Sequence, residues 1–342
     1  MTATTGRTVT PTAVQVLPPE ADQATWLAAR RGGIGASEVA AIVGVSKYDG
    51  PLKVCLDKWG LLPPRDSAAM EWGRRLERAV LEKFQDEHPD LYVMGSPGLC
   101  AHAGEGWRRC TPDGLISDGP TDEWAELFES KTGSSRDDEW GEPGTDEIPY
   151  SYLCQVTWSC DILSLPRWRV AVLLDGRDYR EYAGDLDPSF ATSLRTRCFA
   201  FWFGNVVAGV QPAADDLDST AELLSARHRK DRSNEDEVEL PSEAADWLKS
   251  YHIHHQAEKA AKKGKQGASN WFKQAQLAAG DGRYGLLDGE RVTDWRPSGG
   301  GPKEVFDLDV FRAEHPKLAA KYTKTETTDP TYSMYVIGGA SK

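Results

Sequence analysis

The sequence lacks the features that mark membrane proteins and metal-cluster proteins. No apolar run approaches the roughly 18 residues that suggest a membrane-spanning helix. The first twenty residues, MTATTGRTVTPTAVQVLPPE, have neither the basic start nor the apolar core of a signal peptide. Six cysteines are present, but no two form a Cys-x-x-Cys pair, which argues against a zinc or iron–sulfur site. We therefore expect a cytoplasmic protein with buried thiols and no membrane partner.

Basic residues are scarce relative to acidic ones. The 342 residues include 40 Lys and Arg against 53 Asp and Glu, a formal net charge of −13. This balance excludes a protein that coats nucleic acid by its overall charge, although it is compatible with a local basic groove. The proportions of hydrophobic (39%) and charged (27%) residues are those of a globular protein, and the length allows one large domain or two ordinary ones.

The hydrophobic pattern predicts a mixed α/β core. Helical periodicity is present in four segments, residues 22–45, 66–88, 149–163 and 188–209. Short strands are predicted at residues 91–99, 107–110 and 124–130. A strand at 167–174, a turn and residues 179–184 predict a hairpin. This order of helices and strands favours the α/β class.

A shift to polar, acidic composition near residue 212 predicts a domain boundary. We expect a flexible leader at residues 1–21, a core at 22–212 and a C-terminal extension at 213–342. The extension has a lysine-rich helical stretch, a hairpin with Asp288-Gly289 at its turn, and one more helix near its end. The lysines of residues 259–273 would contact a DNA backbone or form a solvated helix face. Neighbouring acids, which offset their charge, favour the solvated face.

The stretch CTPDGLISDGPTDEWAELFESKTG, residues 110–133, carries the main chemical signal. Asp113 lies in a Pro-Asp-Gly turn, and Glu129 and Lys131 share one face of a predicted strand, with Ser130 opposite. Two carboxylates beside an ammonium group suit Mg²⁺ and an attacking water. The plain alternative is an ordinary β-turn and a solvated Glu–Lys pair.

Other polar residues lie on the neighbouring predicted helices. Glu77 is on the amphipathic helix 66–88, as a surface charge or as an acid facing the site. Gln155 is on the helix 149–163, where a buried amide needs a hydrogen-bond partner. Arg30, Ser37 and Lys47 surround a glycine-rich turn and a helix start, an arrangement that favours a phosphate. The alternative for Ser37 is a helix N-cap.

Five segments in a fixed order resemble a known family. They are RRGGIGASEVAAIVG, WGRRLERAV, CTPDGL, ESK and YLCQVTWS, between about Trp26 and Leu174. The ordered set is similar to the lambda-type exonucleases and YqaJ-like viral recombinases of the PD-(D/E)xK nuclease superfamily. The resemblance implies a restriction-endonuclease-like core, in which helices flank a mixed central sheet. Helices and a hairpin would then form the C-terminal extension.

The resemblance also implies a role for each matching residue of the metal site. Asp113 and Glu129 would be metal ligands, and Lys131 would be the active-site lysine. Glu77 would be the helical acid that supports the metal site. Gln155 would be the glutamine near the metal and the water.

A second implied site holds the DNA end, through Arg30, Ser37 and Lys47, which match positions that grip a 5′-phosphate. Two features depart from the family pattern. The insertion ISDGPTDEWAELF lengthens the interval between Asp113 and the next acid, and Glu105 is the only acid where some members carry a second one. A second metal ion would therefore be held differently.

The function implied by the resemblance is a Mg²⁺-dependent exonuclease, with Mn²⁺ as an alternative ion. It would degrade duplex DNA from 5′ ends and leave 3′ single-stranded tails for phage-type recombination. Implied partners are double-stranded DNA, a single-strand annealing protein and further copies of the chain in a trimeric ring. Two alternatives are open: another endonuclease of the superfamily, Cas4-like or restriction-type, and a non-catalytic DNA-binding protein. Cas4-like proteins usually carry four cysteines for an iron–sulfur cluster, and the cysteine spacing here offers none.

Overall fold

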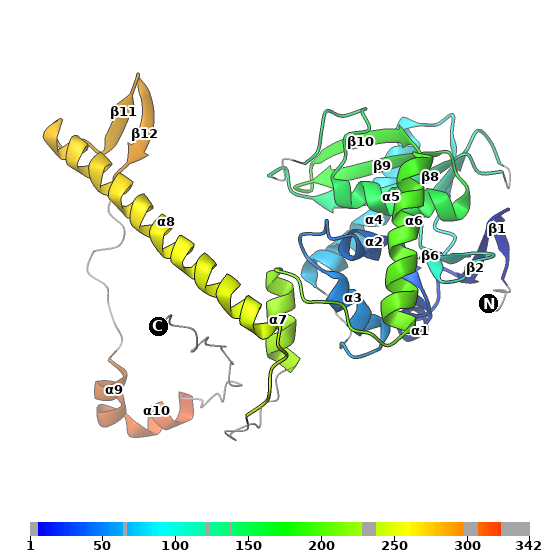
Figure 1. The fold of residues 1–342 in the computed structure, drawn as a ribbon. Helices are drawn as coiled ribbons and strands as arrows, with labels where there is room; N and C mark the ends of the chain where they lie inside the picture. Colours follow the sequence, from blue (N-terminus) through cyan, green and yellow to red (C-terminus); the bar gives the residue numbers. More distant parts are fainter. Residues whose placement is uncertain are drawn as a thin grey trace. The chain divides into compact units, whose positions relative to one another are not determined.

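The structure is a computed structural model that describes residues 6–63, 67–120, 123–136, 139–227, 237–296 and 307–322. It divides into two compact units, Met1–Arg227 and His228–Lys342 (Figure 1). The predicted boundary near residue 212 precedes α7 (Asp218–Arg227), which belongs to the first unit.

Two five-stranded sheets form the first unit. The first has the order β1-β2-β5-β6-β3, and the second has the order β10-β9-β8-β7-β4. In the second sheet β8 and β9 are parallel and the other pairs are antiparallel. The strands of the first sheet are β1 (Thr8–Thr10), β2 (Ala13–Leu17), β3 (Ile34–Gly35), β5 (Leu99–His102) and β6 (Arg108–Cys110). Those of the second are β4 (Tyr92–Gly95), β7 (Gly114–Ser117), β8 (Glu126–Gly133), β9 (Arg167–Leu174) and β10 (Asp178–Asp185).

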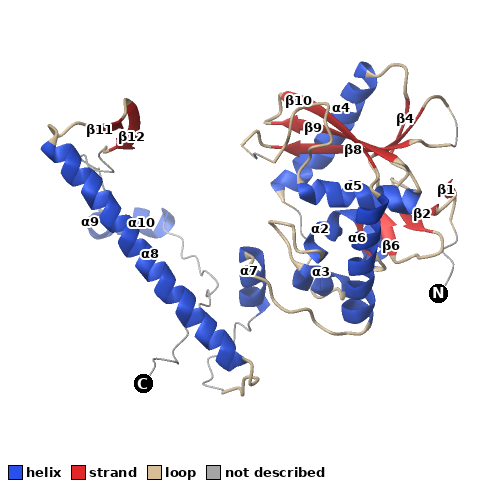
Figure 2. Ribbon diagram, turned by 45° about the horizontal axis from the view of Figure 1, so that its top comes forward, coloured by secondary structure: helices blue, strands red, loops and turns tan. Residues whose placement is uncertain are grey.

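Helices cover both faces of the second sheet, which confirms the predicted α/β class with a mixed sheet (Figure 2). Alternate residues of β8 face the two sides. Phe128 joins a cluster with Val80 and Phe84 of α4 (Ala68–Glu87), whereas Leu127 joins a larger one with Val156 of α5 (Tyr150–Leu163). Behind α5 lie α2 (Val39–Ile42) and α6 (Pro188–Phe201), which continues into the short π-helical segment η2 (Trp202–Val207).

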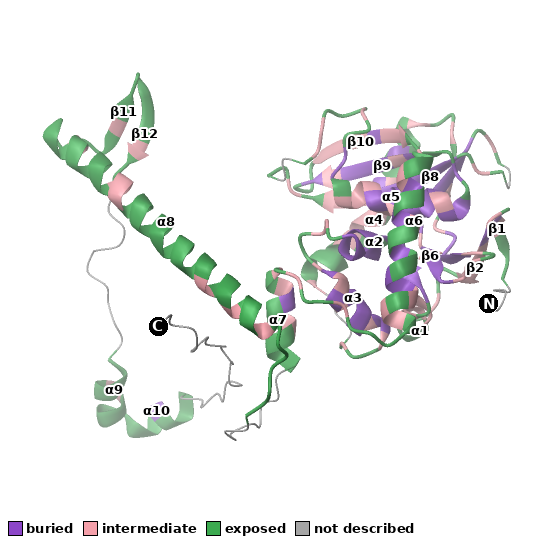
Figure 3. Ribbon diagram, viewed as in Figure 1, coloured by how far each residue is buried: buried purple, intermediate pink, exposed green. Residues whose placement is uncertain are grey.

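Local sequence signals explain where the main helices begin and end. The Ser67 side chain caps α4 by accepting a hydrogen bond from Met70 N at 3.2 Å. Asp187 caps α6 in the same way, with Pro188 in its first turn. Helix α5 ends at Ser164, which adopts a left-handed φ of 56°. Most buried residues of the first unit lie on these helices and on the strands between them (Figure 3).

The predicted flexible leader is wrong over residues 8–17, whereas residues 1–5 lie outside the described residues. Strand β1 pairs with β2, and β2 pairs with β5 in the first sheet. Ala13 is completely buried there. The segment contains β-branched Thr and Val residues, which favour a strand when a partner edge is available.

Two predicted elements are each interrupted at glycine. The helix expected over 22–45 is α1 (Gln23–Arg31), β3, a 3₁₀ turn η1 (Ala36–Glu38) and α2. A side chain at Gly33 would place its Cβ 2.4 Å from the Trp107 carbonyl oxygen, so the chain requires glycine where it meets β6. The strand expected over 91–99 divides at Gly98, whose φ is +86°, into β4 and β5 of different sheets. Strand β7 and helix α3 (Pro51–Lys58) were not predicted.

The second unit contains the predicted lysine-rich helix and hairpin, but the single helix predicted near the end is two short helices that meet at His315 and Pro316. Its elements are α8 (Ala244–Ala278), β11 (Tyr284–Leu287), β12 (Glu290–Asp294), α9 (Leu308–Glu314) and α10 (Pro316–Tyr322). Asp288 and Gly289 both have positive φ, as expected for a tight hairpin turn. No residue of the 35-residue α8 is buried. Among the described helices of both units, none is long and apolar enough to cross a membrane.

Candidate active site

Four elements of the first unit bring the predicted metal-site residues together. Glu129 and Lys131 project from β8, and Asp113 immediately precedes β7, the antiparallel neighbour of β8. Glu77 lies on α4, which packs against one face of the sheet. Gln155 lies on α5, which packs against the other face.

Glu129 is the centre of this group. The residue is buried, at 2% exposure. Oε1 accepts a hydrogen bond from Lys131 Nζ at 2.6 Å and another from Gln155 Nε2. Oε2 is also buried but has no hydrogen-bond partner among the described residues. An unpartnered buried carboxylate oxygen costs free energy, so a cation or a water bound to this atom would stabilise the group.

Asp113 is oriented by a residue that the sequence did not single out. Oδ2 of Asp113 accepts hydrogen bonds from Ser130 N at 2.8 Å and from Ser130 Oγ at 2.9 Å. The alternation of a strand placed Ser130 away from Glu129 and Lys131, so pattern alone gave it no role. Tyr152 is a second site residue that the sequence did not single out. It contacts Lys131, whose Nζ lies 5.4 Å from the centroid of the Tyr152 ring.

The group has an excess of negative charge. Burial, aided by the charge of Asp113, raises the pKa of Glu129 from 4.5 to about 8, although Lys131 opposes the shift. Burial and the same aspartate raise the pKa of Glu77 to about 7. The pKa of Lys131 is also raised, because the charges of Glu129 and Asp113 outweigh the effect of burial. Three acids around one lysine would be stabilised by a further cation.

The carboxylates present fit a hard cation such as Mg²⁺ or Mn²⁺ better than zinc or copper. No three His, Cys, Asp or Glu side chains in the described part of the chain form a metal-binding group. Mg²⁺, however, needs only one or two carboxylates and keeps several of its waters. Asp113 and the unpartnered Oε2 of Glu129 supply two such oxygens. Glu105, the acid at the place where some family members carry a second one, forms an ion pair with Arg108 at 2.8 Å.

Two of the three predicted phosphate-binding residues are in contact. Arg30 Nη2 donates to Ser37 Oγ at 2.7 Å, and the Arg30 guanidinium lies 5.1 Å from the Trp26 ring centroid. Ser37 is exposed on η1. A guanidinium and a hydroxyl side by side at the surface form a donor pair suited to a phosphate.

A buried ion pair that the sequence did not reveal supports Arg30. Glu38 Oε1 is 3.3 Å from Arg30 Nε, and Glu38 Oε2 accepts from Gly35 N at 2.8 Å. Lys58 of α3 donates to Glu38 at 2.9 Å and to the Arg30 carbonyl oxygen at 3.0 Å. Burial raises the pKa of Glu38, but Lys58 and Arg30 outweigh burial and the net pKa is lowered. Glu38 is thus held as a carboxylate.

The third predicted residue, Lys47, has another immediate partner. It forms an ion pair with Glu139, and both line a cavity of about 310 Å³. Gly133 at the end of β8 and Tyr152 line the same cavity, which therefore adjoins Lys131. Lys47 thus lines a cavity that it shares with Tyr152, the neighbour of Lys131.

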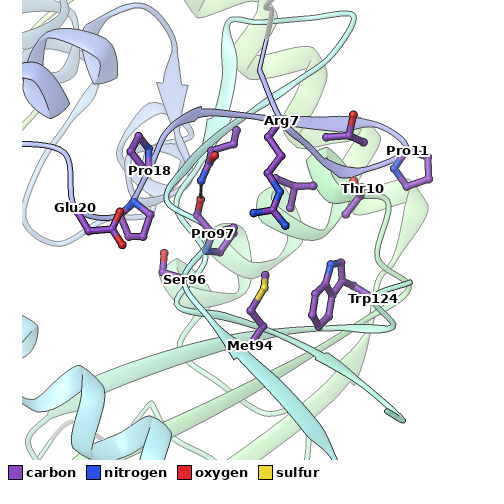
Figure 4. Close-up of a pocket in the computed structure, with 13 residues that line it drawn as sticks. Arg7, Thr10, Pro11, Pro18, Glu20, Met94, Ser96, Pro97 and Trp124 are labelled. Atoms are coloured by element: carbon purple, nitrogen blue, oxygen red, sulfur yellow. Dashed lines mark hydrogen bonds between the residues drawn. The ribbon is translucent and has the colours of Figure 1, made fainter. Parts of the chain in front are cut away.

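A larger cavity, of about 670 Å³, lies between the edge strands β1 and β4 (Figure 4). Arg7, Met94 and Trp124 line it together with several prolines. None of the predicted site residues is part of its lining. Cavity size therefore does not locate the chemistry in this chain.

Comparisons with known proteins agree with the motif resemblance. Residues 25–162 match the family described as the YqaJ-like viral recombinase domain. The chain is 29% identical to the uncharacterized protein YqaJ of Bacillus subtilis (strain 168) over 215 residues, which are 61% of this chain and 64% of that protein. The chain thus spans less than two thirds of that relative. The resemblance to the YqaJ-like family is confirmed.

Two solved structures of an exonuclease are also similar to this chain. One is the alkaline exonuclease LHK-Exo from Laribacter hongkongensis, with 18% identity and a TM-score of 0.43. The other is LHK-Exo in complex with dAMP, with 18% identity and a TM-score of 0.41. Each likeness covers 55% of this chain and 94% of the other.

Proposed function

We propose that this chain is a Mg²⁺-dependent deoxyribonuclease that degrades duplex DNA from 5′ ends and leaves 3′ single strands for recombination. The observation that carries the proposal is the contact of Lys131 and Gln155 with one oxygen of buried Glu129, whose other oxygen has no protein partner. Asp113, fixed by Ser130, supplies a second carboxylate. The match to the YqaJ-like viral recombinase domain supports the recombination role.

The residues of the candidate active site would have different roles in hydrolysis. A magnesium ion held by Asp113 and Glu129 would make water a better nucleophile and would neutralise charge on the phosphate. The Lys131 ammonium, already within 2.6 Å of Glu129, would orient the attacking water and stabilise the charge of the transition state. Gln155 holds the Glu129 carboxylate in one orientation. Glu77, whose pKa burial and Asp113 raise to about 7 in the metal-free fold, would support the metal site as a third acid from α4.

The end of the DNA would be bound outside the metal site. Arg30 and Ser37 form a donor pair for a terminal 5′-phosphate, and Lys47 lines the cavity beside β8. An enzyme that binds a terminal phosphate needs a free end. We therefore propose exonuclease rather than endonuclease activity.

Digestion of duplex DNA labelled at one 5′ end tests this function. With Mg²⁺ the wild-type protein should release the 5′ label before internal nucleotides, and EDTA should stop the release. Glu77→Gln should slow it about 100-fold, on the scale of lost acid–base or electrostatic assistance. Glu82→Gln, an exposed change on the same helix, is the matched control. Release from 3′ ends first, or equal rates for the two variants, would contradict the proposal.

A further inference from the structure

Helix α8 of the second unit differs in charge from the chain as a whole. It contains six lysines and two acids, a net charge of +4 in a chain whose total is −13. The acidic run within residues 229–240 precedes the helix in the sequence, and α8 itself contains only Asp246 and Glu258 as acids. Within α8 itself the lysines are therefore in clear excess.

The lysines share one face of α8. At 100° per residue, five of them fall within an arc of about 140°, and both acids fall outside it. These five lysines define the lysine face: Lys249, Lys259, Lys262, Lys263 and Lys273. All five are exposed. Lys249 is paired with Asp246 at 3.1 Å, and Lys273 lies 6.0 Å from the Trp295 ring centroid.

The dimensions of the lysine face match duplex DNA. From Lys249 to Lys273 the helix rises about 36 Å, at 1.5 Å per residue. This is close to one turn of B-DNA, which is about 34–36 Å long. A straight helix of this length that lies along the duplex can thus meet phosphates wherever a backbone crosses beneath it within one turn.

The opposite face of α8 argues against a membrane as the partner. Its middle consists of small residues, among them Ala257, Ala261, Gly264 and Ala268. Its exposed large apolar residues are confined to the two ends of the helix: Trp247, Ile253, Trp271 and Phe272. Small side chains bury little apolar area, whereas a helix that lies in a membrane surface needs large apolar residues along its length. The charge of the lysine face is therefore the stronger determinant of what α8 binds.

We infer that α8 is a DNA-binding arm, which holds the phosphate backbone of duplex DNA through its lysine face. Binding of this kind is independent of sequence and sensitive to salt. The candidate active site lies in the first unit. The arm would add affinity for duplex DNA from the second unit. The inference goes beyond the proposed nuclease function and does not require it.

Fluorescence anisotropy of a labelled 30-base-pair duplex, with full-length protein in EDTA, tests the inference. EDTA prevents cleavage, so the result does not depend on Asp113, Glu129 or Lys131. The test variant replaces the central lysines of the face with glutamine: K259Q, K262Q and K263Q. The matched control removes three positive charges from α9 and α10 of the same unit: R312Q, K317Q and K321Q. Circular dichroism monitors the fold of both.

The test variant should bind the duplex about tenfold or more weakly than wild type at low salt, and the slope of log K against log salt should fall by about 2.7. The control should bind nearly as wild type, and K259R/K262R/K263R should keep its affinity. If the test variant binds like wild type, or if the control loses as much, α8 is not the arm. If wild-type protein does not bind the duplex but sediments with phosphatidylserine vesicles, the partner is a membrane and the inference is wrong. Should the glutamine variant unfold, K259E alone replaces it, and the slope should then fall by about 0.9, because one lysine contact is lost.

Discussion

Lys131 Nζ lies 2.6 Å from Oε1 of Glu129, two residues earlier on the same strand. Both side chains are almost fully buried, at 13% and 3% exposure. A buried ion pair of this kind rarely adds stability, since the cost of removing two charges from water offsets their attraction. The pair lies within the core strand β8, together with polar groups from α4 and α5, and is therefore better explained by chemistry than by folding.

Stability in EDTA should depend on pH through Glu129. Its pKa is 4.5 in an ordinary environment and about 8 in the metal-free fold. Between these values the folded protein holds a proton that the unfolded chain has lost, so stability should fall as pH rises from about 4.5 to 8. The loss should be on the order of a few kcal/mol. Thermal unfolding at pH 5.5 and 8.5 measures it.

Mg²⁺ and the variant Glu129→Gln are the controls for that measurement. Mg²⁺ should raise the Tm more at pH 8.5 than at pH 5.5, because the ion replaces the proton. Glu129→Gln should lack the part of the fall that Glu129 causes and most of the response to Mg²⁺, whereas Glu77, whose pKa is raised to about 7, should keep its own part between about pH 4.5 and 7. An identical pH dependence in the variant would show that another group is responsible.

Ser130→Ala should slow DNA digestion without removing it. The substitution deletes the 2.9 Å bond from Ser130 Oγ to Asp113 but leaves the backbone bond at 2.8 Å. If the lost hydrogen bond raises the activation free energy by about 1 kcal/mol, the rate falls about fivefold. Initial rates on linear duplex measure this change. Thr132→Ala, on the same side of β8, should have little effect, and a greater loss there than at Ser130 would contradict the role of the hydroxyl.

Lys58→Met should destabilise the protein more than Glu38→Gln/Lys58→Met does. The single variant leaves a buried carboxylate with only Arg30 and Gly35 as partners, at a cost of about 3–5 kcal/mol. The double variant removes both charges, so it should recover part of that loss. Urea unfolding of both variants and of the wild type measures the difference. Equal stability of single and double variants would mean that the pair is not coupled.

Arg30→Ala should reduce the preference for 5′-phosphorylated ends. We expect wild-type protein to digest 5′-phosphate duplexes faster than matched 5′-hydroxyl duplexes. The variant loses charge-assisted hydrogen bonds worth about 1.5–3 kcal/mol, which would reduce the ratio of the two rates by about tenfold or more. Arg31→Ala, the next residue on α1, is the matched control. Equal rates on both ends in the wild type would leave Ser37 with a structural role only.

The sequence was sufficient where a local pattern determines the structure. Alternation along a strand predicted that Glu129 and Lys131 face the same way, and helical periodicity predicted α4 and α5. It could not reveal contacts between distant segments. Lys58 meets Glu38 across twenty residues and two elements, and β1 and β2 become strands only because β5 offers an edge. Ser130 was missed for a different reason: strand alternation assigned it to the other face, and its bonds to Asp113 arise at the edge between β7 and β8.

The most direct test of the account is digestion of linear and closed circular duplex DNA with Mg²⁺, by wild type and by Asp113→Asn. Wild type should degrade the linear DNA and leave the circle intact, since the DNA end is the bound group. Asp113→Asn should degrade neither, yet bind duplex in EDTA as wild type does. If Asp113→Asn digests linear DNA at the wild-type rate, the assignment of the active site is wrong.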